Sequence, residues 1–363
     1  MSTSISHSKF LLPLLTATLG LAACANTTAS TNPAKTKQTA TTTTTESATT
    51  STNLNRVGLV DVSALAPRSS YAIYEIASDR CSLIEGSNGS NTDRSVPVAS
   101  VFKLWVLDAL ARSIERGSIS WDDNVEIRDE LRSDPSGEVF QYPQGKNVSV
   151  KRLAELMISI SDNTAADHLI DLLGRKEIEV VIGELAPDGA ERTLPLLSTA
   201  DMSRLKFAHP ELGREYLALT SARRSDYLVG LRERGPLPTD PTELAKLDLV
   251  TPNFVDDIEW FASSDDLCRT MADLARLSRK PGLESINEIF SINNGLPPHQ
   301  ATQWDTKWFK GGSEPGVVAL VYRLAKREVN RVVVITLSNP NEPLQQRMDG
   351  EKIIASIFDR TGK

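Results

Sequence analysis

The chain has 363 residues, of which 40% are hydrophobic and 24% charged, and this composition is ordinary for a globular protein. Its net charge of −7 and the lack of a Lys/Arg stripe argue against nucleic acid as a partner. The histidines are scattered and no Cys-x-x-Cys pair occurs, so we expect neither a metal site nor a cofactor. His168 is most simply a residue on a helix surface.

The first residues indicate an export signal. Lys9 supplies a short basic region, and the apolar stretch from Phe10 to Ala23 is about 14 residues long, too short to span a membrane. The string Leu21-Ala22-Ala23-Cys24 resembles the end of a bacterial lipoprotein signal, which is cut before the cysteine and lipidated on it. An ordinary secretory signal with an incidental cysteine is the alternative. The favoured reading predicts a lipid anchor on Cys24 at the outer face of a membrane.

Composition divides the chain into three regions. Residues 1–23 form the predicted signal peptide. Residues 24–58 are rich in Thr and Ser and contain no aromatic residue, so they predict a flexible tether with nothing to bury. Residues 59–363 are long enough for one large or two-lobed domain.

Besides Cys24, the cysteines are Cys81 and Cys268. In an exported protein they could form one disulfide, and two separate buried thiols are an equal alternative.

Within the domain, the patterns predict strands near both ends and helices between them. Residues 70–76 alternate like a half-buried strand, with 81–85 as the expected hairpin partner. Helices are expected at 100–116, 150–160, 164–173, 210–233, 264–278 and 343–360, and strands at 317–324 and 331–338. This order predicts an α+β (α/β/α) fold. One antiparallel sheet is built from both chain ends, and an all-helical lobe, about 100–305, is inserted between them.

The helix expected at 100–116 has a wide apolar band, so it should be buried on most sides, and it opens with Ser100 and Lys103. Residues three apart share one helix face, which puts an amine beside a hydroxyl and can activate a serine without a histidine. The free N–H groups of a helix start could also stabilise an oxyanion. The same spacing recurs at Ser6/Lys9, in the signal, and at Ser203/Lys206, which we expect on a surface helix without partners.

Three motifs in order carry a resemblance to a known family. Ser100-x-x-Lys103, the loop string Ser161-Asp162-Asn163 and Lys310-Gly311-Gly312 resemble the three signatures of class A β-lactamases and penicillin-binding proteins. The run from Ile158 to Leu173 is similar to the surroundings of the family's second signature. The resemblance covers roughly 70–215 and 255–360, and implies a serine β-lactamase/transpeptidase-like fold with acyl-serine chemistry.

The resemblance also implies a role for each matching residue. Ser100 would be the nucleophile, Lys103 its base or proton relay, and Ser161 the donor to the leaving nitrogen. Asn163 and Lys310 would bind the substrate amide and carboxylate. Gly312 and Ser313 would complete the binding site, with the N–H groups of Ser100 and Ser313 as the oxyanion hole. Taken singly, each could instead be an ordinary cap, turn or strand-edge residue.

Two departures from the family pattern bear on activity. Gly311 stands where the family has Thr or Ser, and the missing hydrogen bond to a charged carboxylate is worth about 1.5–3 kcal/mol. The family's loop glutamate, in a Glu-x-x-Leu-Asn string, has no counterpart, and the segment around 205–260 is longer than in the family. Possible substitutes for that glutamate are Asp240, Glu243, Asp256, Asp257 and Glu259.

These observations predict a membrane-tethered serine hydrolase that acts on β-lactam, ester or peptidoglycan-peptide substrates. Without the glutamate, acylation should outpace deacylation, so β-lactam turnover should be slow. Esterase and DD-peptidase activity are variants of this reading. The alternative is a non-catalytic envelope lipoprotein that binds a cell-wall peptide or a protein partner. The sequence does not determine the oligomeric state.

Overall fold

The computed structural model describes residues 59–87, 94–133, 136–238, 240–244, 246–344 and 348–362. The predicted signal peptide, Cys24 and the predicted tether lie outside the described residues.

A five-stranded antiparallel sheet is built from both ends of the described chain. Its order is β2 (Arg80–Gly86), β1 (Arg68–Ala77), β9 (Val329–Ser338), β8 (Val317–Lys326), β7 (Thr306–Glu314). The N-terminal hairpin therefore pairs with the C-terminal strands, through contacts such as Tyr71 opposite Ile335. This arrangement confirms the predicted fold class.

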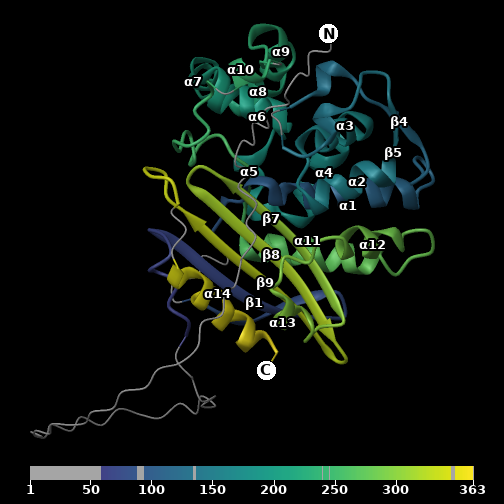
Figure 1. The fold of residues 1–363 in the computed structure, drawn as a ribbon, viewed down its shortest axis with the longest axis vertical. Coiled ribbons are helices and arrows are strands. Elements are labelled where there is room, and N and C mark those ends of the chain that lie inside the picture. The colour runs from purple at the N-terminus through teal and green to yellow at the C-terminus, as the bar shows by residue number, and fades with distance from the viewer. Residues whose placement is uncertain are drawn as a thin grey trace, which may run out of the picture. The chain divides into compact units, whose positions relative to one another are not determined.

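Alternating side chains give the sheet two buried faces. On one face, Tyr71, Ile73 and Tyr322 pack against Ile357 and Phe358 of α14 (Met348–Thr361). Figure 1 shows α14 lying along this face. On the other face, the intervening residues, such as Ala72 and Tyr74, join the larger core shared with the helical lobe. The result is a three-layer α/β/α arrangement.

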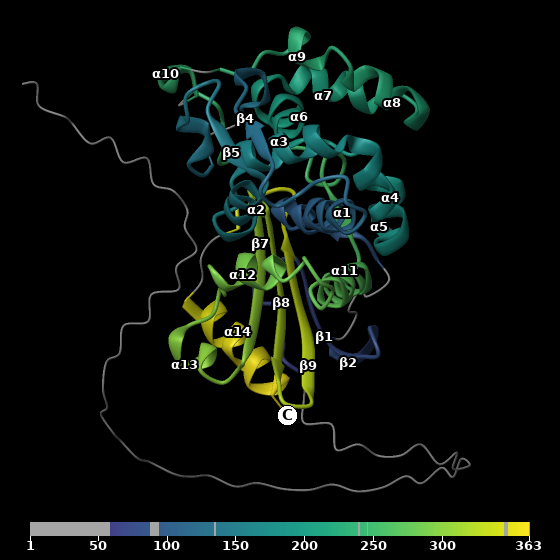
Figure 2. The ribbon, with the colours of Figure 1, turned by 90° about the vertical axis from the view of Figure 1, so that its right-hand side faces the viewer.

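The helical lobe lies between β2 and β7 in the chain. Its helices are α1 (Lys103–Glu115), α2 (Val150–Ser159), α3 (Asn163–Leu173), α4 (Arg175–Leu185), α5 (Pro187–Thr193), α6 (Thr199–Ser203), α7 (Pro210–Leu217), α8 (Ser221–Leu228), α9 (Leu231–Arg234), α10 (Pro241–Leu244), α11 (Ser264–Leu277), α12 (Ser285–Ser291) and α13 (Pro298–Ala301). Short turns and strands complete it: η1 (Ala99–Phe102), η2 (Asp129–Leu131), η3 (Val139–Gln141), the π-helical turn η4 (Arg204–Ala208), β3 (Val96–Pro97), β4 (Asn124–Glu126), β5 (Asn147–Ser149) and β6 (Phe261–Ala262). In Figures 1 and 2, α7 to α10 lie at the end of the lobe farthest from the sheet.

Helix α1 runs through the centre of the molecule. Every residue from Lys103 to Ala111 is buried, as its wide apolar band predicts. The single helix expected at 210–233 is wrong, because the chain forms three short helices there. Thr220 is extended between α7 and α8, and Gly230 is left-handed (φ 80°) between α8 and α9.

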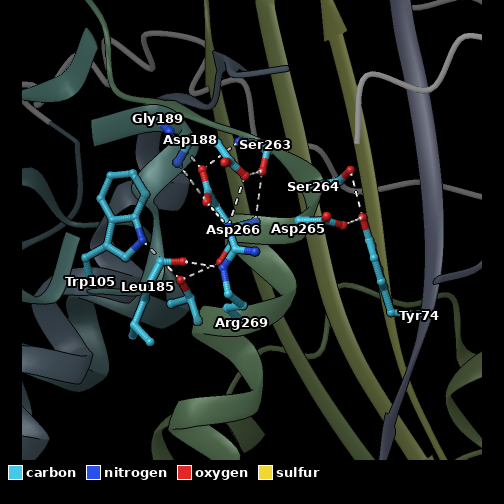
Figure 3. A network of polar contacts seen from close by, with 11 residues as sticks. Tyr74, Trp105, Leu185, Asp188, Gly189, Ser263, Ser264, Asp265, Asp266 and Arg269 are labelled. Atoms are coloured by element: carbon cyan, nitrogen blue, oxygen red, sulfur yellow. Dashed lines mark hydrogen bonds and ion pairs between the residues drawn. The ribbon is translucent and has the colours of Figure 1, made fainter. Parts of the chain in front are cut away.

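Helix α11 is fixed to its neighbours at its start. The buried Asp266 carboxylate accepts hydrogen bonds from the N–H groups of Ser263 and Gly189, both at 3.0 Å, and pairs with Arg269 (Figure 3). Figure 3 also shows Tyr74 of β1 directed at the same helix start, where its hydroxyl contacts Ser264 at 2.9 Å. One carboxylate thus caps α11 and holds it to α5.

Of the two alternatives for Cys81 and Cys268, a disulfide or two separate thiols, the structure contains the disulfide. Cys81 of β2 is bonded to Cys268 of α11, with their Cα atoms 6.2 Å apart. The bond ties the edge strand of the sheet to the helical lobe.

Candidate active site

Ser100 lies on the 3-10 turn η1, immediately before α1, and Lys103 is the first residue of that helix. The expectation that both residues open one α-helix is therefore wrong for Ser100, which lies in the 3-10 turn before the helix begins. Ala99, just before the serine, has a left-handed backbone (φ 45°), which is strained for a residue with a side chain. Ser100 is half-buried, whereas Lys103 is fully buried.

The side-chain nitrogen of Lys103 is the centre of a polar cluster. It lies 3.3 Å from Ser100 Oγ, and donates to Ser161 O at 2.6 Å and to Asn163 Oδ1 at 2.6 Å. Ser161 Oγ is also within reach, at 3.2 Å. The loop before α3 therefore delivers Ser161 and Asn163 to the Ser100–Lys103 pair.

The conformation of this loop is unusual. Ser161 has φ 61°, in the left-handed region that costs a non-glycine residue about 1–3 kcal/mol. Its carbonyl is held from two sides, by Lys103 Nζ and by the hydroxyl of Ser136 at 3.0 Å. Ser136 O in turn accepts from Asn163 N at 3.2 Å. Sequence reasoning missed Ser136, which belongs to no motif.

The middle residue of the loop string, Asp162, is fully buried and holds the loop in place. Its carboxylate caps α3 by accepting a hydrogen bond from Ala165 N. It also accepts from the N–H groups of Glu138 and Val139, at 2.7 and 2.9 Å. Gly137, just before these two residues, must be a glycine, since a Cβ there would lie 2.2 Å from an oxygen of the Asp162 carboxylate. Residues 136–139 thus wrap the loop that carries Ser161.

Lys310 reaches the same cluster from strand β7. Its Nζ lies 3.0 Å from Ser161 Oγ, so both lysines contact one hydroxyl. Burial, together with the charge of Lys103, lowers the pKa of Lys310 well below its ordinary value. A bound anion would oppose this shift and favour the charged form of Lys310.

Gly312 lets β7 approach the turn that carries Ser100. A Cβ on this glycine would lie 2.3 Å from Val98 O and 2.8 Å from Ser100 N, both backbone atoms that cannot move aside. Ser313 follows and is exposed. Gly311 faces the other side of the strand, where a Cβ would meet the Phe309 ring at 2.9 Å, so a side chain at this position needs Phe309 to shift.

The five acidic residues suggested as substitutes for the loop glutamate lie in different settings. Glu243 and Asp240 are exposed near α10, where Glu243 pairs with Lys246. Asp256 pairs with Arg68 on the surface, and Asp257 is exposed. Glu259 alone among the five is buried.

Two sequence expectations outside the motifs are wrong. His168, expected on a helix surface, is 1% exposed, and its Nε2 accepts from Arg128 N at 3.0 Å. The pair Ser203 and Lys206, expected on a surface helix without partners, is buried, and Lys206 contacts two glutamates. Both errors come from tertiary packing that covers a polar helix position.

Across the described part of the chain, no group of His, Cys, Asp and Glu side chains is arranged to hold a metal ion. Nor does any helix within the described ranges have the length and apolarity needed to cross a bilayer.

Comparison with known proteins places this geometry in context. The family model described as the β-lactamase enzyme family matches residues 84–223, which include Ser100, Lys103 and Ser161 but not Lys310. β-Lactamase VEB-1 of Pseudomonas aeruginosa is 29% identical over 86 residues, or 23% of this chain. That match spans 29% of the relative's length.

Solved structures resemble about four fifths of the chain. The β-lactamase of Sphaerobacter thermophilus has a TM-score of 0.51 at 20% identity, over 81% of this chain and 91% of that one. PBP-A has a TM-score of 0.51 at 17% identity, over 81% and 90%. A PBP-A mutant in an acyl-enzyme complex with penicillin G gives a similar match, with a TM-score of 0.51 at 17% identity over 80% and 87%. At these identities the structures establish the fold, which is that of the β-lactamases and related penicillin-binding proteins, and the resemblance inferred from the motifs is confirmed.

Proposed function

We propose that this β-lactamase-like chain is a serine hydrolase that forms an acyl-enzyme on Ser100 with β-lactams or related amides and esters. The observation that carries the proposal is the position of Lys103 Nζ, 3.3 Å from Ser100 Oγ and 3.2 Å from Ser161 Oγ. One amine thus links the proposed nucleophile to the proposed proton donor, and contacts of this length tighten to the range of proton transfer when a substrate binds.

In the acylation step, Ser100 Oγ attacks the substrate carbonyl carbon and its proton passes to the unprotonated amine of Lys103. The carbonyl oxygen becomes an oxyanion, for which the N–H groups of Ser100 and Ser313 are the proposed donors; the close approach of Gly312 to Ser100 N supports this. The C–N or C–O bond then breaks, and the leaving atom takes a proton from Ser161 Oγ. The proton held by Lys103 restores the Ser161 hydroxyl, so the step leaves an acyl-serine and a neutral amine.

Two further residues fit substrate binding. Asn163 accepts from Lys103 through Oδ1, which places its side-chain amide within the cluster, and this amide is proposed to bind a substrate carbonyl. Lys310 supports a carboxylate-bearing substrate, because an anion beside it would stabilise its charged form. Position 311 faces the other side of β7 from Lys310, so a hydroxyl there would not point at a carboxylate held by Lys310.

Deacylation by water is proposed to be the slow step. Of the five candidate acids, four are surface or half-exposed groups, and both oxygens of the buried Glu259 already accept hydrogen bonds. A short burst of product followed by slow turnover is the expected kinetic pattern for β-lactams. Esters should turn over faster, since an alkoxide leaves more readily than an amine. A DD-peptidase acting on peptidoglycan stems is a variant of the same chemistry.

The location is proposed from the sequence of the N-terminus. Cleavage before Cys24 and lipidation on it would anchor the domain at the outer face of a membrane, in the cell envelope. The Cys81–Cys268 disulfide supports export, since such bonds persist in oxidising compartments.

The alternative is a non-catalytic envelope lipoprotein that keeps the fold and binds a cell-wall peptide or a protein partner. The observations in its favour are Gly311 and the unmatched loop glutamate.

The deciding experiment is incubation of the domain with a fluorescent penicillin, followed by mass analysis of the peptide that contains Ser100. A persistent adduct on Ser100 supports acylation with slow deacylation, and rapid ester hydrolysis without an adduct supports an esterase. Absence of both refutes the enzyme and leaves the binding protein. Lys103→Ala should abolish labelling in a folded protein, and labelling at the wild-type rate would exclude the role given to Lys103.

A further inference from the structure

A second buried charged group lies beside the proposed active site. Lys206 of η4 donates to Glu259 Oε2 at 3.2 Å and also contacts Glu314 Oε1. The side chains of Lys206 and Glu259 have no exposed surface, and that of Glu314 is 11% exposed. The acyl-transfer chemistry proposed above makes no use of these three residues, which we call the Lys206 cluster.

Glu314 belongs to the strand that carries Lys310. Positions 310, 312 and 314 share one face of β7, since side chains alternate along a strand. Lys310 reaches Ser161, and Gly312 lies against Ser100 N. Glu314 is therefore one step further along the face that meets the nucleophile turn, directly after Ser313.

Glu259 belongs to the segment that holds the other side of that turn. The next residue, Trp260, accepts from Val98 N at 2.9 Å through its carbonyl. Its ring stacks on Phe102, with ring centres 3.8 Å apart. Through its neighbour Trp260, Glu259 is thus linked to both ends of the turn that contains Ser100, at Val98 and at Phe102.

The charges of the cluster depend on Lys206. The charged groups that face Glu314 are Lys206 from η4 and Glu259 from the segment before β6. Burial, with the charge of Glu259 added, raises the pKa of Glu314 well above its ordinary value. Although burial disfavours its charge, Glu259 and Glu314 raise the pKa of Lys206, so the ammonium keeps its proton. Without it, two buried carboxylates would face each other and repel.

We propose that Lys206 is a positioning residue for acylation, which ties the Ser313 end of β7 to the segment that holds the Ser100 turn. This inference rests on the proposed function and extends it to a residue that touches neither nucleophile nor substrate. Its action is to keep the two proposed oxyanion donors, Ser100 N and Ser313 N, at a fixed separation. Misplacing one such donor costs on the order of 100-fold in rate.

The test compares Lys206→Met with the wild type and with Lys280→Met, which breaks a matched Lys–Glu pair with Glu115 on the surface. Labelling of Ser100 by fluorescent penicillin should slow about 10-fold or more at pH 8 in Lys206→Met and stay unchanged in Lys280→Met. The deficit should narrow toward pH 5.5, because Glu314, whose pKa is raised by burial, gains a proton that it can donate to Glu259 in place of the lost link. Wild-type labelling at pH 8, or a deficit that does not change with pH, overturns the proposal.

A second readout does not depend on acylation. Hydrogen exchange of peptides covering 306–318 and 94–102 should quicken in Lys206→Met, while a peptide covering 68–77 should not change; equal exchange in all three overturns the proposal. If the wild type forms no adduct, the proposed function fails. Hydrogen exchange then still decides whether Lys206 holds β7 against the turn that contains Ser100. Should Lys206→Met not fold, the double variant Lys206→Met/Glu314→Met removes the repulsion without supplying a new hydrogen-bond donor to Glu259. It should fold, label slowly at pH 8 and show no recovery at pH 5.5, and fast labelling would count against the proposal.

Discussion

Replacing Ser136 by Ala should slow acylation far more than it destabilises the fold. The variant loses the 3.0 Å hydrogen bond from Ser136 Oγ to Ser161 O, while the bond from Lys103 to the same carbonyl remains. One neutral hydrogen bond contributes about 0.5–1.5 kcal/mol to the free energy of unfolding. Ser161, however, has a left-handed backbone that costs about 1–3 kcal/mol, and it relaxes when a restraint is removed. A shift of about 1 Å in a reacting group costs on the order of 100-fold in rate.

The assay is the rate of Ser100 labelling by a fluorescent penicillin, with urea denaturation of the same preparations. Ser159→Ala is the matched control. Ser159 lies two residues before Ser161 and donates a 2.6 Å bond to Glu155 O, within α2. Ser136→Ala should label about 10- to 100-fold more slowly, and Ser159→Ala within about twofold of the wild type, at similar losses of stability. Ser136→Thr, which keeps a donor, should restore the rate. Equal labelling rates in the two alanine variants would refute the positioning role of Ser136.

Three further predictions follow from the same contacts. Gly312→Ala should destabilise the fold by about 1–3 kcal/mol and nearly abolish labelling of Ser100, because its Cβ must push β7 away from backbone atoms; labelling and melting curves test this. Asp266→Asn should cost about 2–4 kcal/mol in urea unfolding, while labelling of the folded protein stays unchanged. One carboxylate oxygen accepts from Ser263 N and Gly189 N and the other from Asp188 N and Arg269, and an amide can replace only one of these two acceptors. Burial, reinforced by Asp273, raises the pKa of Asp108 from 3.8 to about 8, so the wild type loses stability as the pH rises through this range and Asp108→Asn does not. Between pH 5 and pH 8, the unfolding free energy of Asp108→Asn should rise by about 1–4 kcal/mol relative to that of the wild type. A difference between the two proteins that is the same at both pH values would contradict the raised pKa of Asp108.

Four strands of the five-stranded sheet, all but β7, and the longer helices α1, α2, α3, α11 and α14 could be predicted because their residues carry a local period. Residues 70–76 and 331–338 alternate or run apolar as buried strands do, and 264–278 follows the helical period. Pairing of the two chain ends followed from element order, since strands at both ends must share a sheet to bury their apolar faces. The long helix at 210–233 failed because a turn at Thr220 and a left-handed Gly230 interrupt a pattern that remains amphipathic overall.

The motif residues of the candidate site could be found because they lie in short sequence motifs. The residues that hold them in place, such as Ser136 and Lys206, could not be found in this way. Ser136 is an isolated serine, and its value arises only when residues 136–139 wrap a loop 25 positions later in the chain. Lys206 was expected on a surface, because its partners Glu259 and Glu314 lie 53 and 108 positions away. No periodicity within one helix reports contacts at such separations.

The candidate site is divided between the two structural parts of the domain, and this division determines where a substitution affects chemistry rather than stability. The helical lobe supplies Ser100, Lys103 and Ser161, and the sheet supplies Lys310 on its edge strand β7. Their mutual placement depends on the seam where Gly312 meets the Ser100 turn. The Cys81–Cys268 disulfide joins lobe and sheet at β2, the opposite edge of the sheet. Reducing this bond should therefore lower the unfolding free energy and leave Ser100 labelling of the folded protein unchanged, whereas substitutions at the seam, such as Gly312→Ala, should slow Ser100 labelling as well.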